Sequence, residues 1–249
     1  MRSAKACLAR LGGVFMLAFA LIGGPALAEP SVAVRDWPSA GRLAFDVMRG
    51  EDGLKLGEAL HRWRHDDARY EMTLALETTG LAGLLYSFQY VQESKGAIVD
   101  GMLQPERFDV AQSGRKPEQA DFDWKARTVR VVRKGKETIT TIGPGDQDVL
   151  SVWHLAALAA GRTLPAELLL VTNRRATQTT ISEIGTESVR VPAGSFETRR
   201  IRARANTGKL TIDLWVSPQH HGVPVRILLV DDKGQVLDLQ ARSIEFDAS

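Results

Sequence analysis

Cysteine is nearly absent from this sequence of 249 residues, which contains a single one, Cys7. Cys7 lies inside an N-terminal segment that we expect to be removed, so the mature chain would have no thiol and no disulfide. It also precedes the apolar run of that segment, whereas the lipid-carrying cysteine of a lipoprotein follows such a run. The sequence therefore excludes a disulfide-stapled fold, a cysteine metal ligand and a lipid anchor through cysteine in the mature protein.

The sequence also lacks an excess of charge of either sign. It contains 32 lysines and arginines and 30 aspartates and glutamates. Three of the basic residues, Arg2, Lys5 and Arg10, belong to the N-terminal segment. The chain without this segment therefore has 29 basic and 30 acidic residues. Because the mature chain is close to neutral, we expect no nucleic-acid partner and no attraction to an anionic membrane surface.

Long apolar runs are missing except for one, residues 11–23. It follows the three basic residues and leads to the sequence Ala-Leu-Ala that ends at Ala28. This order predicts a signal peptide of residues 1–28, cleaved after Ala28, and export to the periplasm. An uncleaved membrane anchor is the alternative, but the run is shorter than the roughly 20 residues that a span needs. The mature chain, residues 29–249, is expected to have no membrane span.

Most of the mature sequence alternates between apolar and more polar residues, as in residues 70–77, 84–90, 210–216 and 225–229. Side chains of a strand point alternately to the two faces of a sheet, so each run predicts a strand with one buried face. That pattern is typical of antiparallel sheets, and turn sequences rich in glycine, aspartate and asparagine separate the runs. We expect a mainly β fold: one domain over residues 29–249, formed by a single large curved antiparallel sheet, open or half closed as a barrel.

One segment, residues 146–161, departs from the strand period. Its body is apolar on nearly every side, Asp146 or Asp148 can cap its start, and Gly161 can end it. The pattern predicts one helix around residues 146–161 that is buried against the sheet.

The five histidines do not have the spacing of a metal site. His61 and His65 would share a face of a helix, but in a strand four residues span roughly 13 Å, too far for two ligands of one ion. We expect both to be exposed or partly buried strand residues. His220 and His221 are adjacent in a turn, where their side chains diverge. The sequence predicts neither a metal ion nor another cofactor.

His154 lies in the predicted helix, where the simplest interpretation is a histidine that hydrogen-bonds within the core. Ser151 precedes it by three residues, so the two would be neighbours on a helix surface. A hydrolase that uses Ser151 and His154 is therefore the catalytic alternative. No glycine-flanked turn presents Ser151 as a nucleophile, and Asp148 with Ser151 also fits a helix cap. We assign no catalytic residue.

An aromatic stripe is the first candidate for ligand binding, and it consists of Tyr86, Phe88 and Tyr90. These side chains would line an apolar cavity if the curved sheet is hollow, and would belong to the core if it is filled.

A row of arginines is the second candidate, formed by Arg200, Arg202 and Arg204 on one face of a predicted strand. Such a row can bind carboxylates, phosphates or a lipid headgroup. A charged row is more often the solvated face of a strand, and that interpretation stays open.

Several motifs together resemble one family of exported bacterial proteins. They are, in order, G-M-L-Q-P-E-R-F at 101–108, F-D-W at 122–124, D-V-L-S at 148–151, V-P-A-G-S-F-E-T at 191–198, and L-W-V-S at 214–217 followed by V-P-V-R-I at 223–227. The order resembles domain of unknown function 3108 (DUF3108), from about residue 43 to the end. The resemblance implies a periplasmic, mostly β protein and supplies no activity or catalytic residue. The hairpin at 191–196 is also similar to those of periplasmic lipoprotein-carrier half-barrels, which hold acyl chains on a concave sheet.

Export, a curved sheet and the lack of a catalytic cluster predict a non-enzymatic binding or chaperone-like module. Its expected partner is a lipid or another apolar or amphipathic molecule of the cell envelope, held in a concave cavity. A structural module that contacts an envelope protein in envelope or surface-polysaccharide assembly is one alternative. The hydrolase based on Ser151 and His154 is the other.

Overall fold

The computed structural model describes residues 37–50, 53–66, 68–80, 88–159 and 163–247. The predicted signal peptide, Tyr86 and Gly161 lie outside these residues. The strands are β1 Ala40–Arg49, β2 Leu54–His65, β3 Arg69–Thr78, β4 Gln89–Val99, β5 Met102–Gln112, β6 Glu118–Asp123, β7 Thr128–Arg133, β8 Lys136–Thr141, β9 Gln147–Asp148, β10 Glu167–Val171, β11 Ala176–Val191, β12 Gly194–Ala205, β13 Leu210–Ser217, β14 Val223–Asp231 and β15 Val236–Phe246.

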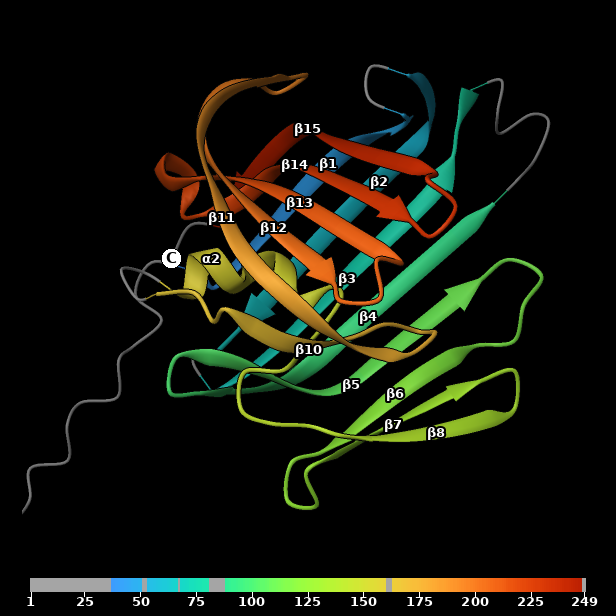
Figure 1. The fold of residues 1–249 in the computed structure, drawn as a ribbon. Helices are drawn as coiled ribbons and strands as arrows, with labels where there is room; N and C mark the ends of the chain where they lie inside the picture. The colour runs from blue at the N-terminus through green and yellow to red at the C-terminus, as the bar shows by residue number, and fades with distance from the viewer. Residues whose placement is uncertain (1–36, 51–52, 67, 81–87, 160–162, 248–249) are drawn as a thin grey trace, which may run out of the picture. The chain divides into compact units, whose positions relative to one another are not determined.

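All fifteen strands belong to one sheet. Their order is β8-β7-β6-β5-β4-β3-β2-β1-β15-β14-β13-β12-β11-β10-β9, so the first and last strands of the chain pair near its centre. Every neighbouring pair is antiparallel except β9 with β10. The sheet curves strongly, and its end strands β8 and β9 do not pair with each other in the described chain (Figure 1). The predicted mainly β fold with one large curved antiparallel sheet is confirmed, in its open form.

The strands form where the sequence alternates, and β3 is a clear example. Tyr70, Met72 and Leu74 are buried on one face, whereas Glu71 and Ala75 are exposed on the other. The apolar face is the concave one, because Leu74 lines a cavity inside the curve of the sheet. Alternation thus sets both the strand and the side on which the core lies.

The helical segment is shorter than the sequence predicts. A 3₁₀ turn, η1 Ser151–His154, leads into one α turn, α2 Leu155–Leu158, and every residue of both is buried. The first residues of the expected helix instead form β9, because Gln147 and Asp148 pair with β10. The Asp148 carboxylate accepts the N–H groups of Leu150 and Ser151 at 2.8 Å each, so it caps the start of the turn without being part of the helix. In the described chain, no helix has the length and apolar character to cross a membrane.

The helical segment packs against strands on both sides of the sheet's centre. Trp153 contacts Phe45 of β1 edge-on at 6.5 Å and His61 of β2 at 5.3 Å between ring centroids. On the other side, α2 approaches the β13–β14 turn so closely that a Cβ at Gly222 would lie 2.9 Å from the Ala157 Cα. Gly222 also has a left-handed φ of +71°, so two separate reasons favour glycine at this position.

The variant Gly222→Ala is expected to lower the free energy of unfolding by about 2–4 kcal/mol, because the new methyl group meets backbone atoms of α2 and the left-handed φ is strained. Gly208→Ala is the matched control, since Gly208 has a φ of +69° and nothing within 4 Å of the new Cβ. It is expected to lose only about 1 kcal/mol. Urea unfolding of both variants measures the difference, and equal losses would contradict the close approach of α2.

Candidate functional site

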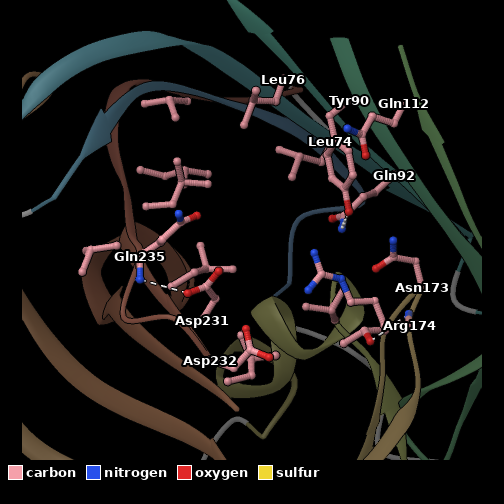
Figure 2. A pocket seen from close by; sticks show the side chains of 18 of the residues that line it. Leu74, Leu76, Tyr90, Gln92, Gln112, Asn173, Arg174, Asp231, Asp232 and Gln235 are labelled. Carbon is pink, nitrogen blue, oxygen red and sulfur yellow. Dashed lines mark hydrogen bonds between the residues drawn. The ribbon is translucent and has the colours of Figure 1, made fainter. Parts of the chain in front are cut away.

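A cavity of about 690 Å³ lies on the concave face of the sheet. It is lined by residues of strands from β1 through β5 and from β10 through β15 (Figure 2). Its volume lies within the usual range for pockets that hold small organic ligands. The interior of the sheet is therefore hollow at this end.

The walls of the cavity are largely apolar. Leu74 and Leu76 of β3 face the cavity on one side, and Leu229 of β14 with Leu237 of β15 on another. Trp153 of η1 lines the cavity and is itself almost fully buried. Leu76, Leu229 and Leu237 are only half-buried although they belong to the interior. An apolar ligand would contact these three side chains and remove their remaining surface from water.

The mouth of the cavity lies at one end of the strands. Successive turns of an antiparallel sheet alternate between its two ends, so the turns after β1, β5, β7, β10, β12 and β14 share this end. The charged residues of the lining lie in these turns or at strand ends beside the mouth: basic Arg49, Arg115, Arg133, Arg174, Arg175 and Lys209, and acidic Asp231, Asp232 and, near the end of β3, Glu77. The cavity thus combines an apolar interior with a charged, mostly basic mouth.

Two residues of the predicted aromatic stripe line the cavity, and the third, Tyr86, lies outside the described residues. Phe88 and Tyr90 stack with ring centroids 6.4 Å apart and an interplanar angle of 8°. The Tyr90 hydroxyl accepts a hydrogen bond from Gln92 Nε2 at 3.0 Å. Burial raises the pKa of Tyr90, so its phenol is neutral and can donate its proton to a ligand.

The arginine row lies away from the cavity. Arg200 and Arg202 both bind the buried carboxylate of Asp213 in the neighbouring strand β13, at 2.5 and 2.6 Å. These two guanidinium groups therefore compensate a buried charge. Arg204 is exposed and borders a second pocket at the β12–β13 turn. The structure does not bring the row together with Phe88 and Tyr90.

A pair of buried histidines lies beside Trp153. The Nε2 atoms of His61 and His154 are 2.8 Å apart, and His61 Nδ1 lies 2.8 Å from the Thr73 carbonyl oxygen. Trp37 donates its indole N–H to His154 Nδ1 at 2.9 Å. The carbonyl can only accept and the indole can only donate, so both rings are neutral, with the protons on His61 Nδ1 and His154 Nε2.

The expectation for His61, an exposed or partly buried strand histidine, is wrong: it is fully buried. The expectation for His154, a histidine hydrogen-bonded in the core, is confirmed. Burial lowers the pKa of His61 to about 4 and that of His154 well below its usual value. His65, which is partly buried, stacks on Trp37 with a centroid distance of 4.5 Å.

Ser151 and His154 do not form a nucleophile–base pair. The Ser151 hydroxyl donates to the Asp148 carbonyl at 3.1 Å and accepts the Asp148 N–H at 3.0 Å. Both ring nitrogens of His154 are occupied by Trp37 and His61. Both side chains are also fully buried. Their arrangement stabilises the fold and offers no access to a substrate. Among the described residues, no three His, Cys, Asp or Glu side chains are grouped so that they could hold a metal ion.

A second buried polar group surrounds Asp148. Ser94 of β4 donates to Asp148 Oδ2 at 2.5 Å, and Tyr70 of β3 lies 3.1 Å from the Ser94 oxygen, to which it donates in turn. Burial raises the pKa of Asp148 to about 6, and the hydrogen bonds from Ser94 and the backbone oppose that rise. Asp148 therefore connects the end strand β9 to β4 across the opening of the sheet.

Two further hydrogen bonds connect the β9–β10 end of the open sheet to strands β5 and β6. Gln147 of β9 donates to the Leu103 carbonyl of β5 at 2.8 Å, and Asn173 after β10 donates to Glu118 of β6 at 2.6 Å. Together with the Asp148–Ser94 bond they form a row that we call the seam. The seam closes the side of the cavity where backbone pairing stops.

Comparison with known proteins identifies the family and the fold. The sequence profile described as "Protein of unknown function (DUF3108)" matches residues 44–240, close to the region that the sequence motifs predicted. A β-barrel-like protein of domain of unknown function DUF1849 from Brucella abortus is similar over 85% of this chain and 99% of its own, with a TM-score of 0.58 and 11% identity. At that identity the likeness shows the fold alone.

Two other solved structures match with lower scores. One is described as a "putative lipoprotein" from Parabacteroides distasonis, with 12% identity, coverage of 84% of this chain and 97% of its own, and a TM-score of 0.36. The other is described as a "putative exported protein with YmcC-like fold" from Bacteroides fragilis, with 12% identity, coverage of 84% of this chain and 96% of its own, and a TM-score of 0.32. None of the curated proteins matches the chain.

Proposed function

The chain belongs to the DUF3108 family of proteins of unknown function, and we propose that it is a non-enzymatic binding module that holds one apolar or amphipathic molecule in its interior cavity. The observation that carries the proposal is the cavity of about 690 Å³ with leucine walls and a charged mouth. Binding in the periplasm, to a molecule of the cell envelope, belongs to the same proposal and rests on the predicted signal peptide.

The cavity supports binding because its apolar surface faces open space while the rest of the interior is packed. Leu76, Leu229 and Leu237 keep exposed surface inside the sheet, and each buried CH₂ group of a ligand would add about 0.8 kcal/mol of favourable transfer free energy. A chain-like ligand can enter through the mouth without breaking any strand pair.

The alternative of an interaction module that pairs through a free strand edge has less support. The edge strand β8 is short and fully or partly exposed, and Ile139 is its one large apolar side chain. Its first two residues, Lys136 and Glu137, are charged. Short, charged edge strands are typical of edges that are protected against pairing. We therefore favour the cavity as the functional site.

The proposal is tested on the full chain, produced with its N-terminal segment in a Gram-negative host and purified without detergent. Native mass spectrometry followed by organic extraction is expected to reveal a bound amphipathic species that is released when the protein unfolds. A ligand-free protein that also fails to take up the neutral fluorescent dye Nile red would contradict the proposed function.

The variant Leu76→Trp is expected to weaken Nile red binding by about tenfold or more, because the larger side chain fills the cavity from β3. Ala75→Trp is the matched control: the neighbouring side chain on the same strand is exposed on the opposite face. It is expected to bind the dye like the wild type. Fluorescence titration measures both dissociation constants, and equal effects of the two substitutions would contradict binding inside the sheet.

A further inference from the structure

The basic residues of the mouth gather near the seam. Arg174 and Arg175 follow Asn173, which hydrogen-bonds to Glu118, and Glu118 also pairs with Arg133 at 3.3 Å. Arg115 precedes Glu118 by three residues in the β5–β6 turn. We call Arg115, Arg133, Arg174 and Arg175 the basic corner of the cavity.

Most of these charges have no counterion of their own. Arg115, Arg174 and Arg175 are exposed, and none of them forms an ion pair with a carboxylate of the described chain. Arginines outside the mouth are mostly paired, as in Arg107 with Asp109 or Arg226 with Asp238. Glu118, the one carboxylate at the corner, is already shared by Arg133 and Asn173. The corner therefore keeps positive charge that is not neutralised by ion pairs within the described chain, and Asp231 lies close enough to Arg174 for the arginine to contribute to lowering the pKa of that carboxyl.

Neutral hydrogen-bonding groups lie next to the basic corner. Figure 2 shows Arg174 and Asn173 on the same side of the cavity as Tyr90, Gln92 and Gln112, and Asp231, Asp232 and Gln235 on the other side. The Tyr90 hydroxyl receives a hydrogen bond from Gln92 and keeps its own proton available. Guanidinium groups and a phenol that are directed at one place can donate hydrogen bonds to the oxygens of a carboxylate or a phosphate.

We propose that the basic corner, with Arg174 and Arg175 as its main contacts, binds the anionic headgroup of an acyl or alkyl ligand whose chain lies among the cavity leucines. This inference rests on the proposed function, since it assigns the headgroup of the molecule that the cavity holds. Charge at the mouth of an apolar cleft concentrates anions there. Three acidic residues also line the cavity, but Asp231 accepts the N–H groups of Lys233 and Gln235 within its own turn.

The test measures displacement of Nile red by three ligands with the same chain: dodecanoate, dodecyl phosphate and dodecanol. We expect one or both anions to bind the wild type at least about tenfold more tightly than the alcohol. The anion affinity is also expected to fall as sodium chloride rises from low to high concentration, while the dodecanol affinity stays constant. Preference for the phosphate would indicate a phosphorylated lipid, and preference for the carboxylate a free fatty acid.

The double variant Arg174→Gln, Arg175→Gln is expected to lose this preference. Its affinity for the anions falls about tenfold or more, and its affinity for dodecanol changes less than twofold. The matched control is Arg62→Gln, Arg190→Gln, which removes two exposed arginines outside the cavity lining and leaves all three affinities unchanged.

The outcomes separate the headgroup assignment from the proposed function. The headgroup assignment is overturned if the wild type binds dodecanol and both anions equally. It is also overturned if the arginine variant loses the same affinity for all three ligands. In either case the cavity is still a binding site. Failure of all three ligands and of Nile red to bind overturns the proposed function and the headgroup assignment with it.

Discussion

The variant Asp148→Ala is expected to have a free energy of unfolding about 3–5 kcal/mol below that of the wild type. The Asp148 carboxylate is fully buried and accepts three hydrogen bonds, from the backbone of Leu150 and Ser151 and from the hydroxyl of Ser94. Alanine leaves these three donors without an acceptor and opens the connection between β9 and β4. Denaturant unfolding at neutral pH measures the loss.

The variant Asp148→Asn separates hydrogen bonding from charge at the same position. Its amide oxygen can still accept the two backbone N–H groups, so the loss is expected to be smaller than for alanine. Its stability relative to the wild type also depends on pH. The pKa of Asp148 is about 6 in the folded protein against 3.8 for the free group, so the folded wild type takes up a proton more readily and gains stability as the pH falls through this window.

The Asp148→Asn variant has no titrating group at this position, so its free energy of unfolding does not rise as the pH falls. The difference in free energy of unfolding between wild type and Asp148→Asn is therefore expected to shift in favour of the wild type by up to about 3 kcal/mol between pH 7.5 and pH 4. A difference that stays constant with pH would show that folding does not raise the pKa of Asp148, and hence that the hydrogen bonds from Ser94 and the backbone offset the effect of burial.

The fold was largely predictable because strand formation follows a local pattern. The alternation of Tyr70, Met72 and Leu74 with polar neighbours is visible in the sequence, and it fixes both the strand and its buried face. The length of the helical segment was not predictable in the same way. Gln147 and Asp148 are compatible with a helix start, and only their pairing with β10, a strand some twenty residues further along the chain, makes them a strand.

The candidate site was predictable in part. Phe88 and Tyr90 were identified because a stripe on one strand is a local pattern, and both line the cavity. The basic corner was missed because its residues come from separate turns, which only the sheet order brings to one end. Arg174-Arg175 was a visible signal, an adjacent basic pair that directly follows Asn173.

The sequence of a single strand also does not show which of its charged side chains are paired with an opposite charge on a neighbouring strand. Arg200 and Arg202 form a conspicuous row in the sequence, yet the buried carboxylate of Asp213 on the next strand binds both. Arg115 looks ordinary in the sequence and lacks a paired carboxylate in the described structure. The difference depends on register between strands, which a single strand's sequence does not contain.

The histidine pair was hidden for the same reason, since His61 and His154 are 93 residues apart. The histidine pair leads to the second prediction, a loss of stability in acid. Each ring nitrogen already has one hydrogen-bond partner, so neither ring can accept a proton without losing a hydrogen bond. Folding therefore keeps both histidines neutral. The unfolded chain takes up protons on them as the pH falls below about 6.5, so stability is lost between that pH and the lowered pKa of about 4 for His61.

The loss from His61 alone is expected to reach about 3 kcal/mol at pH 4. Asp148 titrates in the same range with the opposite sign, so the measurement is made in the Asp148→Asn background. There, the free energy of unfolding is expected to fall steeply from pH 7.5 to pH 4. Replacing both rings in that background, His61→Leu with His154→Leu, removes the two groups that cause the fall.

The double histidine variant is expected to start from a lower stability at pH 7.5, because Trp37 and Thr73 lose their partners, and to show a much flatter pH profile. The matched control, His221→Asn, removes an exposed histidine at a left-handed position that asparagine tolerates, and it should keep the steep profile. A steep profile in the double variant would assign the acid sensitivity to another group. His65 is then the first to replace, because it stacks on Trp37 beside the pair.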